Sequence, residues 1–338
     1  MRHVIIRAFG PPDTMAVECF TATTPDDHEV MIEVSACGVN FPDLAIRLGI
    51  SLDAPTLPHV PGYEVSGRIV ERGRNVTDFQ VGDRVFAMIP GGGYATHVTC
   101  RSDQLFHVPP DMSDDEASVI SISYLTAWLS VNRLAGVRAG EIVVIHSAGG
   151  GVGLAALQLC VTRGAHVIAI AGENKHARLQ FVGADACIDP SKEDITARLR
   201  ELTNCKGVDV ILDSTGGQSY NQSYQSLSPL GRLVLLGSAG VISESETSPL
   251  QSARFRYPPM QLSPPLLMKA NKSISGLHLP PLLSCHDICV EGMAEILSLY
   301  ENGYVMPIID AVFSLDDASE AHRHLHARNN FGKVVLHP

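Results

Sequence analysis

The sequence predicts a two-domain α/β protein in which a doubly wound parallel sheet follows an antiparallel β-domain. From about residue 141 onward, apolar strand-like runs alternate with helical runs, a pattern typical of parallel sheets. Over the first 120 residues, short apolar runs are instead broken by Gly, Pro and Asp, which favours an antiparallel, partly closed β-domain. The length of 338 residues agrees with two domains, since a single hydrophobic core rarely serves so long a chain.

The β-domain is expected to contain several short strands and to include the end of the chain. A short apolar run, VII, between basic residues predicts the first strand, and further strands are expected in VMIEVSA, VSGRIVERG and DRVFAM. The last forty residues return to a strand, a helix and a strand in IIDAVFSL, DASEAHRHLHAR and GKVVLHP. We expect this terminal segment to fold back on the N-terminal domain.

The parallel sheet is expected to begin with the strand EIVVIHSA. A small-residue helix, a second strand and a second helix follow in GVGLAALQLCVTRG, HVIAIAG and NKHARLQFVG. Ile195, Leu199 and Leu202 then recur at helical spacing, and two more apolar strands are expected in VDVILDSTGG and GRLVLLGSAG. Residues 241–271 are rich in proline and large apolar side chains, so we interpret them as a lid or interface segment.

The composition is that of a globular protein, with 45% hydrophobic and 18% charged residues. No apolar run approaches the roughly 20 residues that a membrane-spanning helix needs. The 25 basic and 36 acidic residues give a net charge of −11, which disfavours a general nucleic-acid surface. The eight cysteines are scattered, and the N-terminal apolar stretch is too short for a signal peptide. We therefore expect a cytoplasmic protein with reduced, mostly buried thiols and with neither a membrane nor a nucleic-acid partner.

A glycine-rich stretch follows the first strand of the parallel sheet and opens the first helix. It contains the predicted cofactor-binding residues Gly149, Gly150, Gly151, Val152 and Gly153. Compared with the template G-x-G-x-x-G, Gly150 would let the backbone approach a pyrophosphate and Gly153 would let the helix pack closely on the strand. The helix N-terminus would add positive potential. This context predicts a dinucleotide site; a tight turn of an ordinary α/β protein is the alternative.

The end of the second strand bears on the choice of cofactor. An NAD-specific site usually has an acidic residue there, where this sequence has Ala171. The nearby Lys175 suits a 2′-phosphate, whereas Glu173 opposes one and Lys175 could also be a solvated helix charge. The sequence therefore favours NADPH.

Taken together, these motifs resemble the medium-chain dehydrogenase/reductase superfamily in its zinc-free quinone oxidoreductase and enoyl reductase branch. The match runs nearly end to end, through CGVNFPDLAIRLG, PGYEVSG, VGDRVFAM, GGGYATHV, YLTAW, HSAGGGVGLAALQL, GVDVILDSTGG and GKVVLHP. Within the branch, YLTAW and SISGLHL are most similar to the vesicle amine transport protein group and to polyketide enoyl reductase domains. The resemblance implies a GroES-like catalytic domain over residues 1–121 and 290–338, a Rossmann domain over residues 122–289, and a cleft between them.

The resemblance also bears on the metal. Zinc-dependent relatives carry ligands at the positions of Asn40, Tyr63 and Ile122, and all three have changed here. The closely spaced cysteine quartet of the structural zinc lobe is absent as well. We therefore predict no metal, and interpret Cys37 as a small buried residue and His59 as a loop or core histidine.

The implied activity is NADPH-dependent hydride transfer to an activated C=C bond, as in an enone or enoyl thioester, or to a quinone. Without a Lewis acid, oxidation of an ordinary alcohol is a poor fit, whereas an activated alkene needs less polarisation. The alternative is a cofactor-binding regulatory or structural protein with little turnover. We also expect a homodimer, because SISGLHL should form an edge strand that relatives pair across a two-fold axis.

The resemblance assigns residues to this chemistry. It places Asn40 and Thr126 beside the nicotinamide, and it gives Lys175 and Arg328 to the 2′-phosphate. The nicotinamide-side wall is expected to comprise Ser238, Leu277 and Leu279.

The proton donor is a separate question. The tyrosine that many enoyl reductases use is replaced here by Ser51. Tyr63 is therefore the first candidate for the catalytic acid, with Tyr124 and solvent as alternatives. Asp43 is interpreted as a structural hydrogen-bonding residue in its turn.

Overall fold

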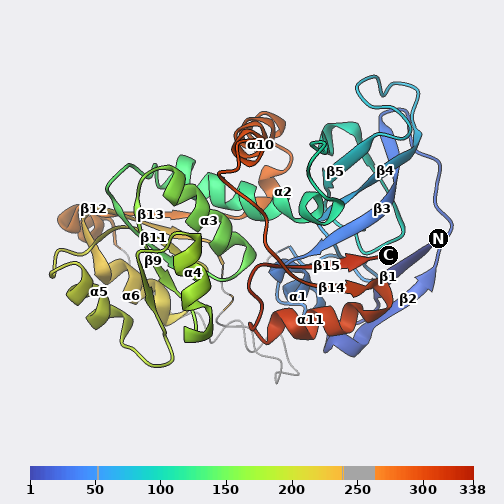
Figure 1. The fold of residues 1–338 in the computed structure, drawn as a ribbon. Helices are drawn as coiled ribbons and strands as arrows, with labels where there is room; N and C mark the ends of the chain where they lie inside the picture. Colours follow the sequence, from blue (N-terminus) through green and yellow to red (C-terminus); the bar gives the residue numbers. More distant parts are fainter. Residues whose placement is uncertain (52, 238, 240–262) are drawn as a thin grey trace.

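The computed structural model describes residues 1–51, 53–237, 239 and 263–338, and it has two lobes that lie side by side (Figure 1). The N-terminal and C-terminal strands form one lobe, and the parallel sheet with its helices forms the other. Two helices, α2 (Asp114–Trp128) and α10 (His286–Glu301), pack against each other between the lobes. The predicted α/β fold class is confirmed.

The first lobe is built on a seven-stranded sheet with the order β14-β15-β3-β4-β5-β7, in which β6 also pairs with β3. Its strands are β3 (Glu29–Val39), β4 (Glu64–Arg72), β5 (Arg84–Met88), β6 (His97–Arg101), β7 (Leu105–His107), β14 (Ile309–Ser314) and β15 (Lys333–His337). β15 pairs antiparallel with the end of β3, which places the C-terminal strands in the N-terminal sheet. A separate two-stranded sheet and two helices complete this lobe, namely β1 (Arg2–Ile6), β2 (Met15–Cys19), α1 (Phe41–Arg47) and α11 (Ala318–His326).

The second lobe is a six-stranded parallel sheet with the order β10-β9-β8-β11-β12-β13. Its strands are β8 (Ile142–His146), β9 (His166–Ile170), β10 (Ala186–Ile188), β11 (Val208–Asp213), β12 (Leu227–Leu235) and β13 (Ser273–Gly276). Its helices are α3 (Gly151–Thr162), α4 (His176–Val182), α5 (Ile195–Leu202), α6 (Gln218–Ser226), α8 (Pro264–Ala270) and α9 (Leu279–Leu282). Short 3₁₀ turns lie at Pro12–Thr14, Ser102–Gln104, Glu173–Lys175 and Leu315–Asp317, and a π-helical turn at Leu129–Leu134 continues α2.

Strand β8 shows why the parallel strands read as continuous apolar runs. Val143 and Ile145 belong to the larger core cluster, which also contains the buried residues of α2 and α3. Val144, between them, belongs to a second cluster with Leu199 of α5. Both faces of the sheet are thus covered by helices, as doubly wound sheets require, and neither face keeps a polar stripe.

The two expected domain boundaries fall inside the helices that join the lobes. Position 121/122 lies within α2, and position 289/290 lies within α10. α2 packs on α3 of one lobe and on β3 and β4 of the other, so the larger core cluster runs through both lobes. The division into two domains stays a prediction about which parts of the chain fold together.

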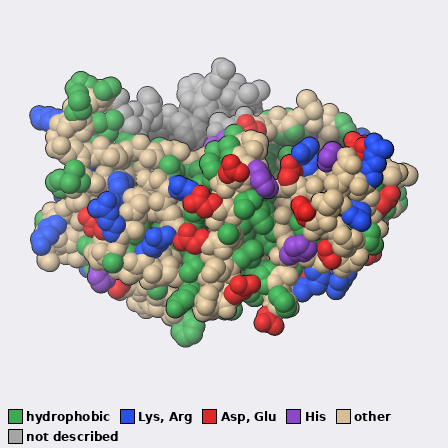
Figure 2. Space-filling view, turned by 90° about the horizontal axis from the view of Figure 1, so that it is seen from above, with side chains coloured by type: hydrophobic (Ala, Val, Ile, Leu, Met, Phe, Trp, Pro, Cys, Tyr) green, Lys and Arg blue, Asp and Glu red, His purple; other side chains and the backbone are tan. Residues whose placement is uncertain are grey.

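The surface carries charges of both signs without a large basic patch on the face seen in Figure 2, where apolar side chains gather near the middle. Within the described residues, no helix has both the length and the apolar character needed to cross a bilayer. All eight cysteines are free thiols. Four of them are buried, namely Cys37, Cys100, Cys160 and Cys289. Cys187 is half-buried, and the exposed thiols are those of Cys19, Cys205 and Cys285.

Candidate active site

The glycine-rich loop joins β8 to α3. Gly150 is the N-cap of α3, and no side chain caps this end of the helix, so its first N–H groups stay available to an anion. A Cβ on Gly153 would lie 2.5 Å from the backbone oxygen of Ser147, which means that only glycine lets the helix pack this close to the strand end. A Cβ on Gly150 would make only an ordinary contact, at 3.4 Å from the same oxygen. The open backbone at Gly150 fits the pyrophosphate of a dinucleotide.

The stems of two lysines lie against this loop. A Cβ on Gly149 would come within 2.7 Å of Lys175 Cδ, and a Cβ on Gly151 within 2.5 Å of Lys333 Cδ. The N–H of Gly332 donates to the carbonyl of Gly149 at 2.9 Å. The chain segment that leads into β15 is therefore in direct contact with the glycine-rich loop.

Lys175 and Arg328, the two residues predicted to hold the 2′-phosphate, lie together beside the loop. The Lys175 ammonium donates to the backbone oxygens of Arg328 at 2.7 Å and Asn330 at 2.6 Å. The Arg328 guanidinium donates to the carbonyl of Ala239. Burial lowers the pKa of both side chains, because it disfavours their charged forms. An anion bound here would offset that cost.

Ala171 directly follows β9, and its carbonyl accepts a hydrogen bond from the His176 ring at 2.8 Å. Glu173, the residue whose charge opposed a phosphate, forms an ion pair with Lys192. Its carboxylate is therefore already paired with a cation. The negative charge of Glu173 therefore opposes a 2′-phosphate less than the sequence alone suggested.

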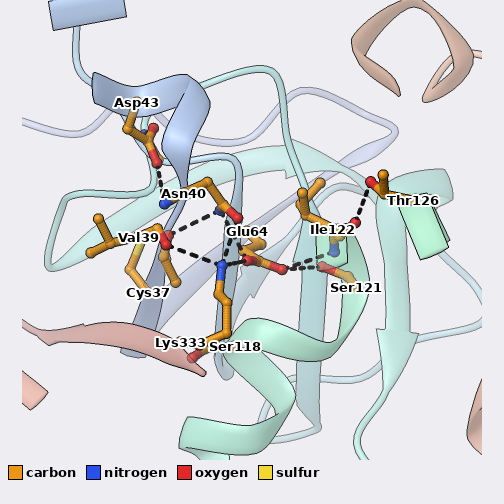
Figure 3. Close-up of polar contacts among 12 residues, drawn as sticks. Cys37, Val39, Asn40, Asp43, Glu64, Ser118, Ser121, Ile122, Thr126 and Lys333 are labelled. Carbon is orange, nitrogen blue, oxygen red and sulfur yellow. Dashed lines mark hydrogen bonds and ion pairs between the residues drawn. The ribbon is translucent and has the colours of Figure 1, made fainter. Parts of the chain in front are cut away.

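Asn40 occupies the N-cap of α1, directly after β3. Its backbone N–H donates to the Asp43 carboxylate at 2.8 Å. Its carboxamide Nδ2 donates to Glu64 Oε1 at 2.9 Å and to the Gly38 carbonyl at 3.3 Å (Figure 3). Its Oδ1 accepts from Lys333 Nζ at 2.5 Å. Both ends of the amide are thus held by side chains from other elements.

Glu64 and Lys333 form a buried ion pair beside Asn40, with 2.9 Å between Nζ and Oε1. The Glu64 side chain is 0% exposed and that of Lys333 is 7% exposed. The second carboxylate oxygen of Glu64 accepts from Ser121 Oγ at 2.8 Å and from the Ile122 N–H at 2.9 Å, both on α2 (Figure 3). The pair meets the requirement that buried charges be both neutralised and hydrogen-bonded.

Asp43 links the α1 cap to the loop before β4. Its second oxygen accepts from the Gly62 N–H at 2.9 Å, and the carboxyl group is fully buried. Burial raises the pKa of Asp43 to about 7, although the two backbone donors act in the opposite direction. These contacts are those of a structural hydrogen-bonding residue.

The two tyrosines considered as proton donors have different surroundings. Tyr63 lies between Gly62 and Glu64 in sequence, and burial, together with the charge of Asp43, raises the pKa of its phenol. Tyr124 donates to Gln158 at 2.7 Å, which ties its hydroxyl into the packing of α2 on α3. Of the two, Tyr63 is the neighbour of Glu64 in sequence.

The remaining predicted residues belong to several elements. Thr126 lies on α2, and its hydroxyl donates to the Ile122 carbonyl at 2.7 Å. Leu277 follows β13 and donates a backbone hydrogen bond to the last residue of β12, and Leu279 is the first residue of α9. Ser238 lies outside the described residues.

The positions that correspond to zinc ligands do not fit a zinc ion. The carboxamide of Asn40 is engaged by Glu64 and Lys333, and the side chain of Ile122 has no donor atom. A divalent cation beside Glu64 would have to displace the Lys333 ammonium. Across the described part of the chain, no cluster of three or more His, Cys, Asp or Glu side chains could hold a metal.

Comparison with known proteins identifies the family. Residues 26–110 match the family of alcohol dehydrogenase GroES-like domains, and residues 151–280 match zinc-binding dehydrogenases. The synaptic vesicle membrane protein VAT-1 homolog of Rattus norvegicus is 32% identical over 341 residues, covering 100% of this chain and 84% of the relative. Quinone oxidoreductase of Sus scrofa is also 32% identical over 341 residues, covering 99% and 97%. The chain belongs to the medium-chain dehydrogenase/reductase superfamily.

A solved structure shows that the similarity extends to the three-dimensional fold. Escherichia coli quinone oxidoreductase complexed with NADPH matches with a TM-score of 0.87 at 25% identity, covering 100% of both chains. The predicted resemblance to quinone oxidoreductases and to the vesicle amine transport protein group is thus confirmed.

Sequence reasoning missed Glu64 and Lys333. Both lie in motifs that carried the resemblance, PGYEVSG and GKVVLHP. The available signal was the presence of one acidic and one basic residue within otherwise small or apolar motifs, since such residues are seldom buried unless paired. Their partnership was not visible, because 269 positions separate them.

Proposed function

We propose that this protein is a metal-free, NADPH-dependent reductase that transfers hydride to an activated C=C bond, as in an enone or enoyl thioester, or to a quinone. The observation that carries the proposal is Lys333. Its stem lies against Gly151 of the glycine-rich loop, and its ammonium holds the carboxamide of Asn40. The loop suited to a dinucleotide and the residue expected beside the nicotinamide are thus in contact through one side chain.

The residues around the glycine-rich loop account for cofactor binding. The backbone of residues 149–153 and the N-terminus of α3 would hold the pyrophosphate. Lys175 and Arg328 would hold the 2′-phosphate through charge-assisted hydrogen bonds. Thr126, Leu277 and Leu279 are proposed to border the nicotinamide end. The similarity to the NADPH complex of the E. coli enzyme supports this choice of cofactor, which supplies the hydride when bound.

Two residues are proposed to act on the substrate. The hydroxyl of Tyr63 would deliver the proton to the α-carbon; burial raises the pKa of this phenol, so the proton is present at neutral pH but is held more tightly than in a free phenol. Asn40 would border the reacting groups as a fixed wall of the site, since Glu64 and Lys333 hold its amide in one orientation. Solvent remains the alternative acid.

The proposal is tested with NADPH that carries deuterium at the transferred position and a panel of enones, enoyl thioesters and quinones. We expect the label at the β-carbon of a reduced enone. Label on a carbinol carbon would instead show carbonyl reduction and contradict the proposal. The Tyr63→Phe variant measures the contribution of the phenol, with a small effect expected if water can replace it.

A second function, cofactor binding with little turnover in a regulatory or structural role, is favoured by one observation. The similar rat protein is named for a vesicle membrane rather than for a reaction. Tight NADPH binding without NADPH consumption across the whole panel would support this alternative. For either function we propose a cytoplasmic location.

We also propose a homodimer formed through β13. This strand is the last of the parallel sheet, and within the described residues it pairs only with β12. Exposed strand edges are normally covered or paired, and a second copy could extend the sheet across a two-fold axis. Light scattering should report about twice the chain mass of 36.3 kDa, and a monomer at micromolar concentration would contradict the proposal.

A further inference from the structure

A lysine is an unexpected residue at the start of β15. The Lys333 side chain is 7% exposed, and removing an ammonium group from water is costly unless several acceptors replace the lost hydration. Its Nζ has three such acceptors: the carbonyl of Val39 at 3.1 Å, Asn40 Oδ1 at 2.5 Å and Glu64 Oε1 at 2.9 Å. An apolar side chain could fill this space without any of them. The cluster therefore calls for an explanation beyond packing.

We propose that Lys333 is a positioning residue of the reaction, because its ammonium fixes the orientation of the Asn40 amide. The proposal rests on the reductase function proposed above. The charge of Lys333 acts through Asn40, whose position corresponds to a ligand in zinc-dependent relatives.

The hydrogen bonds allow only one orientation of the Asn40 amide. Glu64 accepts from Nδ2, and Lys333 donates to Oδ1. If the amide turned by 180°, its oxygen would face the carboxylate and its NH₂ would face the ammonium. Both contacts would then be repulsive, because a carboxylate only accepts and an ammonium only donates.

The position of the ammonium is set relative to the glycine-rich loop. The Lys333 stem is so close to Gly151 that a Cβ there would lie 2.5 Å from Cδ of the lysine. The other end of the cluster is fixed to α2, where Glu64 accepts from Ser121 and from the Ile122 N–H. Lys333 thus fixes the Asn40 amide with respect to the loop that would hold the cofactor.

The test combines Lys333→Met, Asn40→Ala and the double variant. We expect Lys333→Met to lower kcat with a quinone or enone by about 10- to 100-fold, the scale for losing an outer partner that orients a site residue. The Kd for NADPH should change less than about 3-fold. In the Asn40→Ala background, Lys333→Met should cost less than about 2-fold more, since its effect passes through Asn40. Equal losses in both backgrounds, or a Kd that rises as much as kcat falls, would overturn the proposal.

Two further variants guard against misfolding and general effects. Lys333→Met leaves the Glu64 carboxylate without its cation, so Glu64→Gln is combined with it to restore a neutral cluster, and the kcat loss should persist. Lys272→Met is the matched control. Lys272 is a half-buried lysine outside this cluster, which donates to the Tyr224 carbonyl at 2.8 Å, and its removal should leave kcat unchanged. A kcat loss of similar size in Lys272→Met, or full activity in the neutral double variant, would contradict the positioning role.

A readout without turnover separates this inference from the proposed function. The side-chain amide of Asn40, assigned in ¹⁵N spectra through Asn40→Ala, should shift or broaden in Lys333→Met while remaining unchanged in Lys272→Met. An Asn40 amide signal that is identical in wild type and Lys333→Met would overturn the inference, whatever the activity. If the wild type turns over no substrate, the reductase function fails and this spectrum alone decides the role of Lys333.

Discussion

The ammonium group of Lys175 donates a hydrogen bond to the backbone oxygen of Asn330 at 2.6 Å. This contact joins the parallel-sheet lobe to the segment that leads into β15. It also keeps the lysine beside Arg328, whose own carbonyl is its second acceptor at 2.7 Å. The proposed 2′-phosphate pocket is thus built by residues from both lobes.

Lys175→Met should therefore weaken binding of NADPH but not of NADH. A lost charge-assisted hydrogen bond corresponds to roughly a 10- to 100-fold rise in Kd for the phosphorylated cofactor. Titration of nicotinamide fluorescence with each cofactor measures the two constants. Lys206→Met, at an exposed lysine, is the control and should change neither. A parallel loss for both cofactors would mean that Lys175 supports the loop rather than the phosphate.

Alanine at Gly150 should weaken cofactor binding, whereas alanine at Gly153 should lower thermal stability. A Cβ at Gly150 makes only an ordinary contact, so Gly150→Ala should keep the melting temperature and lose cofactor affinity by at least about 10-fold. A Cβ at Gly153 would collide with the Ser147 carbonyl at 2.5 Å, so Gly153→Ala should unfold at a lower temperature even without cofactor. Calorimetry with and without NADPH distinguishes the two. A destabilised Gly150→Ala protein would show that this loop is not an open cradle.

Asp43 should make the protein less stable as the pH rises toward neutrality. Its pKa in the folded protein is about 7, above the ordinary value of 3.8, so the folded state binds a proton that the unfolded state has released. The stability from this group is full below about pH 4 and is lost as the pH rises from there through 7, by roughly 4 kcal/mol.

Urea unfolding of wild type and Asp43→Asn at pH 4, 6 and 8 isolates this effect as a difference between the two proteins. The difference matters because His322, with a pKa lowered to about 3 by burial, contributes in the opposite direction. The same pH dependence in both proteins would rule out Asp43 as its source.

The purified protein should contain no stoichiometric zinc and should keep its activity in a chelator. The reason lies in the ligand positions: the carboxamide of Asn40 is engaged by Glu64 and Lys333, and the side chain of Ile122 has no donor atom. Elemental analysis before and after dialysis against EDTA measures both quantities. About one zinc per chain, with activity lost on its removal, would contradict the metal-free site.

The parts of the fold that could be predicted from sequence are those with a regular apolar pattern. β8, α3 and β9 follow one another as expected, because both faces of their sheet are buried and their strands are short apolar runs. Helix α2 was not predicted. Its residues from Ala117 to Leu125 are all buried, so no polar stripe with the helical period marks it in the sequence.

In the candidate site, too, local motifs could be predicted from sequence, whereas contacts between distant residues could not. The glycine-rich loop is a local motif, and Gly150 and Gly153 occupy the positions that its spacing implied. The Glu64–Lys333 pair depends on β15 returning to the end of β3, which no local pattern specifies. Asn40 was singled out through the resemblance, but the partners that fix its amide could be found only in three dimensions.

The placement of β15 between β14 and β3 has a consequence for synthesis on the ribosome. All six strands of the parallel sheet have emerged once residue 276 leaves the exit tunnel, so that lobe can assemble while translation continues. Glu64 emerges early, but its cation arrives only with residue 333. A chain that ended before that point would contain the glycine-rich loop but would lack both the Gly332 contact to it and the cation that neutralises Glu64. Translation through residue 333 is therefore needed before the Asn40 amide can be held in its fixed orientation.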